Sequence, residues 1–369
     1  MALKNRLEPV AAGDALATWW QARHPDADEV MVRDVEIPHA SGMSSETVLF
    51  RLECAENGAA VARELVARVI PAENRVFPAH SFELERAAME AVRAADVPTP
   101  LVRHIENDPT ILGGPFLVMS RMYGRVLADD PPFTAVGWLL DLEATAQAAL
   151  FENSLRALAG IHRADPGALP PTTLGHPDRG SSLAQHVSHW EDLFAWAARG
   201  REHPTVTAGL DWVRKNLPAD DSATLSWGDA RLGNLMFGPD QQVTAALDWE
   251  LAAIGPRELD LGWFCVVNRV YTAGFGLPNP PGFPDQNAVL ARYGELTGHQ
   301  VRDFEFHEIF AAVRLSVVLL RLGTMMIEAG LMPPDAPLPI SNPFSHLLAQ
   351  LMELPPPTAG AAAWVTGSR

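Results

Sequence analysis

The spacing of hydrophobic residues predicts that the first third of the chain forms strands and one or two helices. Residues 9–23 carry a helical pattern that ends before a polar HPDAD segment. The short hydrophobic runs at residues 29–37, 47–52 and 64–70 are typical of β-strands. The segment between the first two runs, HASGMSSE, is rich in small residues, which predicts a turn that joins two strands.

A second helix is expected within this strand-rich part. In residues 81–95, apolar side chains recur at helical spacing, among them Leu84, Ala88 and Val92. The helix should stop before VPTP, because residues that precede proline avoid helical backbone angles. The segments LVRHIE and PFLVMSRM then predict two further strands.

After Gly124 the pattern becomes mostly helical. Residues 134–165, 181–202 and 203–217 are expected to be mainly helix. Three short strand-like runs, TLSWG, NLMFG and VTAALDW, interrupt the helices within residues 222–249.

Capping residues mark two of the later helices. Asp285 and Gly298 are expected to cap one helix, and Gly330 is expected to be the C-cap of a long helix that starts near Phe306.

This order predicts an α+β fold with two lobes. A small β-rich N-lobe is expected over residues 1–119, a short joint over 120–122, and a large, mostly helical C-lobe over 123–354. The remaining residues 355–369 are rich in Pro, Ala and Gly, which predicts a flexible tail.

Composition and charge narrow the class of protein. Of 369 residues, 47% are hydrophobic and 20% are charged, which is an ordinary globular balance. The net charge of −17 argues against a nucleic-acid partner, which requires a basic surface, and against docking on anionic membranes.

Several features predict a soluble, cytoplasmic protein. Cys54 and Cys265 lie far apart and show no metal-binding spacing, so they are expected to be buried free thiols in a reducing compartment. Residues 1–20 lack the apolar core of a secretory signal. The most apolar helical segment, residues 315–327, is interrupted by Arg321 and is expected to be a core helix that is too short and too charged to cross a bilayer.

The segment SWGDARLGNLMFGPDQQVTAALDWE, residues 226–250, carries the candidate chemistry. Asp229 and Asn234 belong to one loop between two predicted strands, and Asp248 ends the following strand. Phosphoryl transfer requires a carboxylate near the attacking hydroxyl and oxygen ligands for magnesium. Asp and Asn supply hard oxygen donors, which favours magnesium over zinc. The alternative is turn and capping chemistry, in which the same residue types are common.

These residues carry a family resemblance. The D-x-x-x-x-N element followed by a strand-end Asp resembles the catalytic loop and metal-binding Asp of protein kinases. WGDARLGN followed by ALDWE resembles the aminoglycoside phosphotransferase and choline kinase-like family, in particular the branch that includes kinase-like domains fused to acyl-CoA dehydrogenases. The resemblance covers about residues 14–352. Trp227 stands where many family members have His. This difference bears on how the loop is held in place.

The resemblance implies a protein kinase-like fold and roles for five residues. Asp229 matches the catalytic base, and Asn234 and Asp248 match the magnesium ligands. Arg68 occupies the place of the phosphate-binding Lys of kinases, and Glu85 matches the helix residue that pairs with it. A cation that grips phosphate needs an anionic partner to stay oriented. An ordinary surface ion pair is the alternative for Arg68 and Glu85.

Two further segments are predicted to bind the nucleotide. The first lies between the first two strands, where backbone amides would approach the phosphates; a simple hairpin turn is its alternative. The second is the joint MSRM, where the backbone would meet the adenine. The residues concerned are Ser41, Gly42, Ser44, Ser45, Met119, Arg121 and Met122.

Other conspicuous residues are given supporting roles. His162 is expected to be a structural histidine at a helix end, and Asp260 to fix the catalytic loop by hydrogen bonds. For Glu250, contact with substrate, a second metal or a structural hydrogen bond all remain open. Five tryptophans are assigned to packing: Trp190, Trp196, Trp212, Trp249 and Trp263.

The predicted function is transfer of the γ-phosphate of ATP or GTP, with magnesium, to a hydroxyl of a small molecule. Candidate acceptors are a metabolite, a hydroxyacyl-CoA or an aminoglycoside-like compound. A non-catalytic nucleotide-binding module is the alternative, which the presence of Asp229, Asn234 and Asp248 disfavours. A peptide kinase is disfavoured because the sequence after Asp248 has no D-F-G, no A-P-E and no activation loop between them.

Overall fold

The structure is a computed structural model that describes residues 7–38, 45–71, 75–219 and 222–358. It divides into two compact units. The first comprises Met1–Arg86 and Pro100–Met122, and the second comprises Ala87–Thr99 and Tyr123–Arg369.

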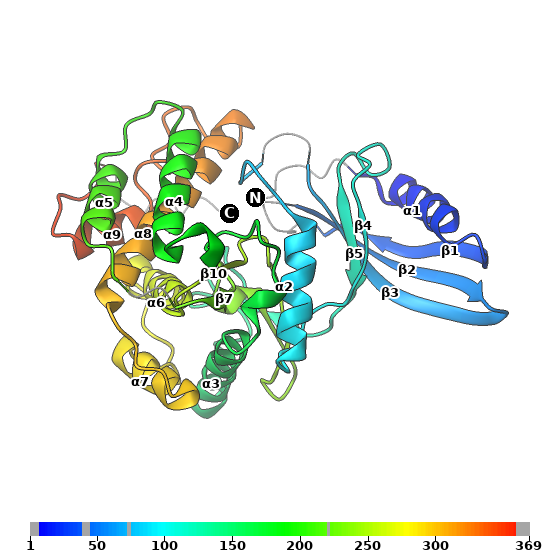
Figure 1. Ribbon diagram of the computed structural model, residues 1–369, viewed down its shortest axis with the longest axis horizontal. Helices are drawn as coiled ribbons and strands as arrows, with labels where there is room; N and C mark the ends of the chain where they lie inside the picture. The colour runs from blue at the N-terminus through cyan, green and yellow to red at the C-terminus, as the bar shows by residue number, and fades with distance from the viewer. Residues whose placement is uncertain (1–6, 39–44, 72–74, 220–221, 359–369) are drawn as a thin grey trace. The chain divides into compact units, whose positions relative to one another are not determined.

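The first unit is an antiparallel sheet with one helix beside it (Figure 1). The strands follow the order β1-β2-β3-β5-β4. Their bounds are β1 Ala27–Glu36, β2 Glu46–Glu56, β3 Ala59–Val69, β4 Val102–Glu106 and β5 Phe116–Ser120, and the helix is α1, Pro9–Arg23. All five strands and the first helix were expected from the hydrophobic pattern.

Alternation of side chains along β2 builds the core of this unit. Val48, Phe50 and Leu52 are buried on one face, because successive side chains of a strand point to opposite sides. The same hydrophobic cluster includes Trp19 and Trp20 of α1, so this helix covers part of the sheet.

Helix α2, Phe82–Ala94, passes from the first unit into the second. Its later turns belong to the second unit, where the Thr99 hydroxyl donates to the Met89 carbonyl at 2.9 Å. The proline-rich segment that follows is joined to β9, since the Ala246 N–H donates to the Pro98 carbonyl at 2.8 Å. The predicted helix over residues 81–95 is therefore confirmed.

The second unit is mainly helical and contains two small sheets, β6-β8-β9 and β10-β7. The helices are α3 Ala144–Ile161, α4 Ser182–Ala198, α5 Pro204–Lys215, α6 Glu258–Tyr271, α7 Gln286–Thr297, α8 Phe304–Glu328 and α9 Pro343–Leu351. The strands are β6 Arg125–Val126, β7 Thr224–Ser226, β8 Leu235–Phe237, β9 Val243–Ala246 and β10 Ala253–Gly255.

The structure corrects two details of the helix prediction. Residues 134–143 form turns rather than helix, and Gly137 within them has a φ of +110°, which is incompatible with a right-handed helix. The C-cap of α8 is Ala329, and Gly330 follows it with a φ of +69°. The Leu331 N–H donates to the Met326 carbonyl, which completes a Schellman motif that requires this glycine. Asp285 and Gly298 cap α7 as expected.

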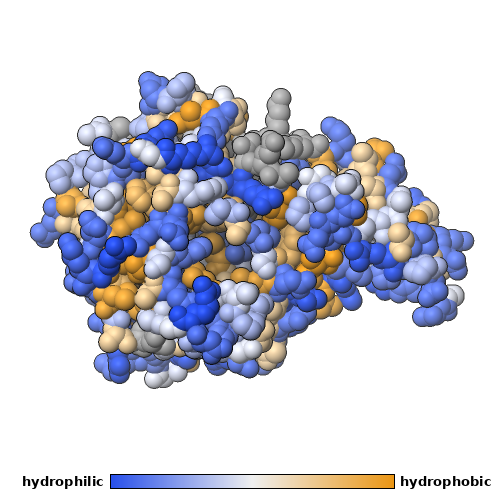
Figure 2. All heavy atoms as spheres, turned by 45° about the horizontal axis from the view of Figure 1, so that its top comes forward, coloured by the Kyte–Doolittle hydropathy of each residue, from blue (hydrophilic) through white to orange (hydrophobic). Residues whose placement is uncertain are grey.

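Helix α8 is the core helix of the second unit. It spans 25 residues and by length and composition alone could cross a membrane, so the expectation that it is too short was wrong. However, 83% of its most apolar window is buried inside the molecule, which confirms its assignment to the core. On the face drawn in Figure 2, hydrophilic residues surround smaller hydrophobic patches. Cys54 and Cys265 are both buried free thiols, as expected.

Candidate active site

In the loop between β7 and β8, the backbone at position 228 can be occupied without strain only by glycine. Gly228 has a φ of +89°, and a Cβ placed there would lie 2.1 Å from the Leu251 carbonyl oxygen. Glycine therefore allows the chain to turn sharply just before Asp229.

Asp260 of α6 holds the beginning of this loop. Its buried carboxylate accepts hydrogen bonds from the Ser226 hydroxyl at 2.8 Å and from the backbone N–H groups of Trp227 at 2.7 Å and Gly228 at 2.9 Å. His162, which caps α3, contacts it through Nε2 at 3.0 Å. Burial opposes ionisation, yet these contacts hold the pKa of Asp260 below its ordinary value. The predicted roles of Asp260 and His162 are confirmed.

Three side chains fix the carboxylate of Asp229. The indole N–H of Trp263 donates to Oδ1 at 2.8 Å. Arg231 Nε donates to Oδ2 at 2.9 Å, and Asn234 Nδ2 donates to the same oxygen at 2.8 Å. The side chain is still 17% exposed, so a substrate group can reach it.

Arg231 links Asp229 to a second carboxylate. It forms an ion pair with Asp129, which also accepts a hydrogen bond from the Tyr271 hydroxyl at 3.1 Å. Burial disfavours the charged guanidinium, but Asp229 and Asp129 together keep the pKa of Arg231 well above its ordinary value. Burial and the nearby Asp129 likewise raise the pKa of Tyr271. The site thus contains a permanent positive charge between two carboxylates.

The pairing of β8 with β9 brings Asn234 and Asp248 together. Leu235 is opposite Ala246, and the Leu247 N–H donates to the Asn234 carbonyl at 2.9 Å. Asp248 follows directly with a φ of +59°, a strained conformation for a residue with a side chain.

Trp227 braces the segment that carries Asp248. Its indole N–H donates to the Leu247 carbonyl at 2.9 Å, and its ring lies 5.7 Å from that of Trp249. The side chain is buried. The tryptophan that replaces the family histidine therefore connects the two halves of the motif through its own hydrogen bond.

The donor set fits magnesium. The amide nitrogen of Asn234 donates to Asp229, so its amide oxygen and the carboxylate of Asp248 are the oxygen donors that the two predicted ligands offer. Among the described residues no group of three or more His, Cys, Asp and Glu side chains could hold a metal. One carboxylate and one amide suit magnesium, because this ion usually completes its coordination with waters and substrate phosphates.

In the first unit, Arg68 and Glu85 form the predicted pair. Arg68 Nη1 donates to Glu85 Oε2 at 2.9 Å, and Arg68 Nε donates to the Ser45 hydroxyl at 3.2 Å. The side chains are 11% and 1% exposed, so this is a buried pair rather than an ordinary surface pair. Burial alone would raise the pKa of Glu85, but Arg68 and His80 bring it below the ordinary value.

The remaining predicted nucleotide contacts have less definite surroundings. Met119 is buried in β5, and Arg121 lies 3.9 Å from both Glu36 and Glu64. The Ser120 hydroxyl points toward the sulfur of Met122 at 3.9 Å. Their roles, and that of half-buried Glu250, stay predictions. Three other predicted residues lie outside the described residues: Ser41, Gly42 and Ser44.

Several residues that contact the candidate base directly or through a neighbour were not predicted from the sequence. Trp263 was assigned to packing alone, and Asp129, Arg231 and Tyr271 were not singled out. Only Arg231 had a local indication, since it stands two residues after Asp229 in the motif. The others come from distant segments of the chain.

A buried cation supports the Trp263 indole from α8. The guanidinium of Arg314 lies 4.9 Å from the Trp263 ring and donates to the Leu259 carbonyl at 2.7 Å. Burial lowers the pKa of Arg314 to about 10, so it remains charged at neutral pH. A positive charge therefore stacks on the ring that hydrogen-bonds Asp229.

Comparison with known proteins agrees with this architecture. A model of the phosphotransferase enzyme family matches residues 36–304. Mouse acyl-CoA dehydrogenase family member 10 is 30% identical over 249 residues, which make up 67% of this chain and 21% of the mouse protein. The chain thus spans only about a fifth of that relative's length.

Solved structures show the same fold. A protein from Ralstonia eutropha JMP134 assigned to the aminoglycoside phosphotransferases is 22% identical, with a TM-score of 0.65 over 92% of this chain and 95% of that chain. A thermostable mutant of aminoglycoside phosphotransferase APH(4)-Ia, in ternary complex with ADP and hygromycin B, is 16% identical, with a TM-score of 0.50 over 86% and 95%. These likenesses confirm the predicted α+β, protein kinase-like fold.

Proposed function

Because the chain belongs to the phosphotransferase enzyme family, we propose that it transfers the γ-phosphate of ATP or GTP to a hydroxyl of a small molecule. The observation that carries this proposal is the environment of Asp229. Its carboxylate is held by three donors, remains accessible, and belongs to the same loop as Asn234. A fixed and accessible carboxylate is what a general base requires.

In the proposed reaction, Asp229 orients the acceptor hydroxyl and accepts its proton as the oxygen attacks the γ-phosphorus. The bond between that phosphorus and the bridging oxygen breaks, and the nucleoside diphosphate leaves. Trp263 and Arg231 keep the carboxylate pointed at the acceptor.

Asn234 and Asp248 would hold magnesium, and the bound ion would neutralise charge on the β- and γ-phosphates. Arg68 would contact the phosphates from β3, and buried Glu85 keeps its guanidinium in one orientation. A protein of this kind uses its side chains mainly for positioning and for electrostatic stabilisation.

For the acceptor, we propose a hydroxylated metabolite, with hydroxyacyl-CoA compounds as the first class to test. This choice is supported by the likeness to proteins named as acyl-CoA dehydrogenase family members. Hygromycin B in the APH(4)-Ia complex supports aminoglycosides as a second class. We also expect a cytoplasmic location, since both cysteines are free thiols.

The test compares two conservative variants of the motif. Asp229→Asn should lower kcat by roughly 10²- to 10⁴-fold with little change in nucleotide affinity, because the proton acceptor is lost while the proposed metal ligands Asn234 and Asp248 are kept. Asp248→Asn should weaken magnesium-dependent nucleotide binding and abolish turnover, because a charge beside the metal is lost. The measurements are calorimetric nucleotide titration with and without magnesium, and turnover on acceptors found by a nucleotide-consumption screen.

Each outcome has a definite consequence. If Asp229→Asn loses nucleotide binding while Asp248→Asn keeps it, the two roles are exchanged. If nucleotide binds but no hydroxylated metabolite, CoA thioester or aminoglycoside is phosphorylated, the chain is a nucleotide-binding module rather than an enzyme. Full activity in both variants would contradict the phosphotransferase proposal.

A further inference from the structure

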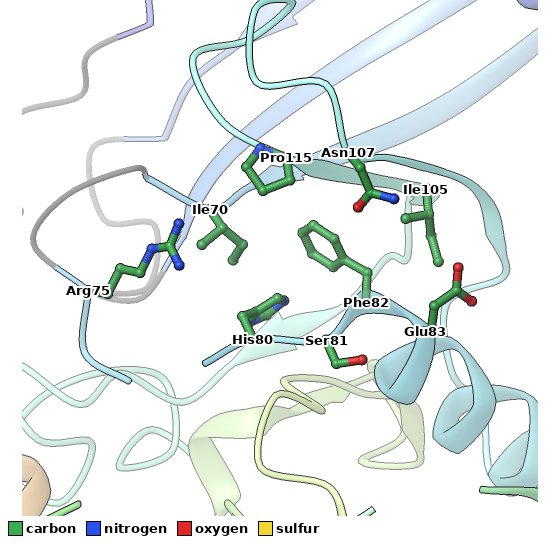
Figure 3. A pocket seen from close by; sticks show the side chains of 9 residues that line it. All are labelled: Ile70, Arg75, His80, Ser81, Phe82, Glu83, Ile105, Asn107 and Pro115. Carbon is green, nitrogen blue, oxygen red and sulfur yellow. The ribbon is translucent and has the colours of Figure 1, made fainter. Parts of the chain in front are cut away.

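A pocket of about 200 Å³ opens in the first unit, where the end of β3, the start of α2 and the strands β4 and β5 meet (Figure 3). None of its lining residues belongs to the loop that carries Asp229, because all of them belong to the first unit. A dry cavity of roughly 150 Å³ is large enough to hold benzene, so this pocket has room for a small substituted ring.

One part of the pocket wall is apolar. It is formed by Ile70, Phe82, Ile105 and Pro115, and Figure 3 shows Phe82 and Ile105 facing the same space from α2 and β4. Such a surface favours a ligand with an aromatic or aliphatic body.

The rest of the wall favours an anionic head group. Arg75 and His80 line the pocket, and so does Ser81, whose hydroxyl accepts from the Leu84 N–H at the start of α2. The N-terminus of a helix carries a partial positive charge. One carboxylate, that of Glu83, also lines the pocket, but it is paired with Arg86 in the next turn of α2.

His80 connects this pocket to the ion pair of the proposed nucleotide site. Its Nε2 lies 2.8 Å from Glu85 Oε1, while Arg68 binds the other oxygen of the same carboxylate. The His80 ring also packs edge-on against Phe82, with centroids 4.5 Å apart. An anion that contacts His80 would fix the orientation of its ring and therefore its contact with Glu85. Because Glu85 orients Arg68, a ligand in the pocket acts on the residue proposed to contact phosphate.

We propose that this pocket is a regulatory site for a small amphipathic anion, an aryl or alkyl group with one carboxylate or phosphate, and that its occupancy strengthens nucleotide binding through His80 and Glu85. The inference that the pocket binds such an anion depends only on its lining residues. The regulatory part rests on the proposed function, since it requires that Arg68 contact a nucleotide.

Binding is tested with three probes of similar size by calorimetry and by NMR on the full chain. Phenylacetate and phenyl phosphate carry the anion, and benzyl alcohol is the neutral counterpart. We expect both anions to bind with millimolar Kd and benzyl alcohol to bind at least about tenfold more weakly, since it lacks the charged hydrogen bonds. The anion with the lower Kd shows whether the pocket prefers a carboxylate or a phosphate head group. Equal binding of all three probes would contradict an anion site.

Substitutions locate the binding. Ile105→Trp should abolish it by filling the pocket, and Arg75→Gln should weaken it by about tenfold. Two control variants make the same kinds of substitution outside this pocket. Ile111→Trp fills a neighbouring pocket whose wall carries two glutamates, and Arg103→Gln removes an exposed charge from β4. Wild-type affinity in both Ile105→Trp and Arg75→Gln would overturn the site, and the second variant serves if the first fails to fold.

Regulation is tested by titrating magnesium-ATP with and without saturating phenylacetate. We expect the nucleotide Kd to fall by about fivefold, the lower end of typical coupling between sites. His80→Phe, which keeps the packing against Phe82, should bind phenylacetate more weakly and, even at saturating phenylacetate, should lose this effect. An unchanged nucleotide Kd in the wild type would overturn the regulatory part. If magnesium-ATP does not bind at all, the proposed function fails together with the coupling, whereas phenylacetate binding that Ile105→Trp removes would still support the pocket.

Discussion

Asp260 and Gly228 show how single residues determine the geometry of the catalytic loop. Asp260 accepts hydrogen bonds from two backbone amides and contacts two polar side chains, and Gly228 lacks the Cβ that would collide with the Leu251 carbonyl. Neither residue needs to touch a substrate. Both act by holding Asp229 in one place, which is the main contribution that this site can make to phosphoryl transfer.

Asp260→Asn is expected to lower the free energy of unfolding by about 3–5 kcal/mol at pH 7, because a buried charged hydrogen-bond network loses its centre. The folded-state pKa of Asp260 lies below its ordinary value of about 3.9. Its stabilisation is therefore complete above pH ~4 and is lost as the pH falls through the folded-state pKa. Thermal unfolding of both proteins between pH 3.5 and 7 should show a constant difference that shrinks only at the acid end.

Asp240→Asn is the matched control, because Asp240 is exposed in a turn of the same unit. Its effect on the melting temperature should be small at every pH. A difference between wild type and Asp260→Asn that grew toward pH 3.5 would contradict the assignment of Asp260 as an ionised acceptor.

Gly228→Ala is expected to reduce kcat by at least about a hundredfold, since a displaced catalytic group loses this much for a shift of roughly 1 Å. The added methyl group would collide with the Leu251 backbone, which cannot move aside as a side chain can. Gly276→Ala is the control, because that glycine also has a positive φ, +68°, but nothing lies within 4 Å of its added Cβ. Equal activity of the two variants would show that the close contact at Gly228 is unimportant.

At the level of elements, α9 illustrates how a local signal and a tertiary contact combine. Asn342 accepts from the N–H groups of Phe344 and Ser345, and the Ser345 hydroxyl accepts from the Asn342 N–H in return. This capping box is fully buried, and α9 packs against the core helix α8. Loss of the cap therefore leaves buried donors without partners.

Asn342→Ala is expected to cost about 1–3 kcal/mol, at or above the usual value for a helix cap because the unpaired groups are buried. Asn342→Ser keeps a capping oxygen and should restore part of the loss. Asp285→Ala removes the exposed cap of α7 and should cost less. Urea unfolding checks the order, and a larger loss for Asp285→Ala than for Asn342→Ala would contradict it.

At the scale of the whole molecule, each unit has its own core with one buried cysteine. Cys54 belongs to the hydrophobic cluster of the first unit, and Cys265 lies in α6 of the second. Burial raises the pKa of both thiols, which further reduces their reactivity.

Both thiols should therefore react with an aromatic disulfide reagent at least about a hundredfold more slowly in the native protein than in urea. The single variants Cys54→Ser and Cys265→Ser assign each remaining rate to one unit. Fast labelling of Cys54 with protection of Cys265 would show that the first unit opens on its own. Fast labelling of both native thiols would contradict the two buried cores.

The features that depend on neighbouring residues along the chain could be predicted from the sequence alone. Alternation and helical spacing gave α1, α2 and the five strands of the first sheet, because periodic burial is a local pattern. The spacing of Asp229, Asn234 and Asp248 identified the motif, because all three lie in one short stretch of the chain that contains β7, β8 and β9. The two-residue strand β6 and the three-residue strand β10 were not predicted from the sequence.

The residues that surround this motif could not be predicted, because they are brought to it by long-range packing. Trp263 reaches Asp229 from 34 residues away, and Tyr271 reaches Asp129 across 142 residues. Arg314 stacks on Trp263 from yet another helix. The Arg314 contact arises where α6 and α8 pack together, and the other two join α6 to loops that are distant in the sequence. Residue spacing specifies which groups can do the chemistry, whereas long-range packing specifies which groups hold them in place.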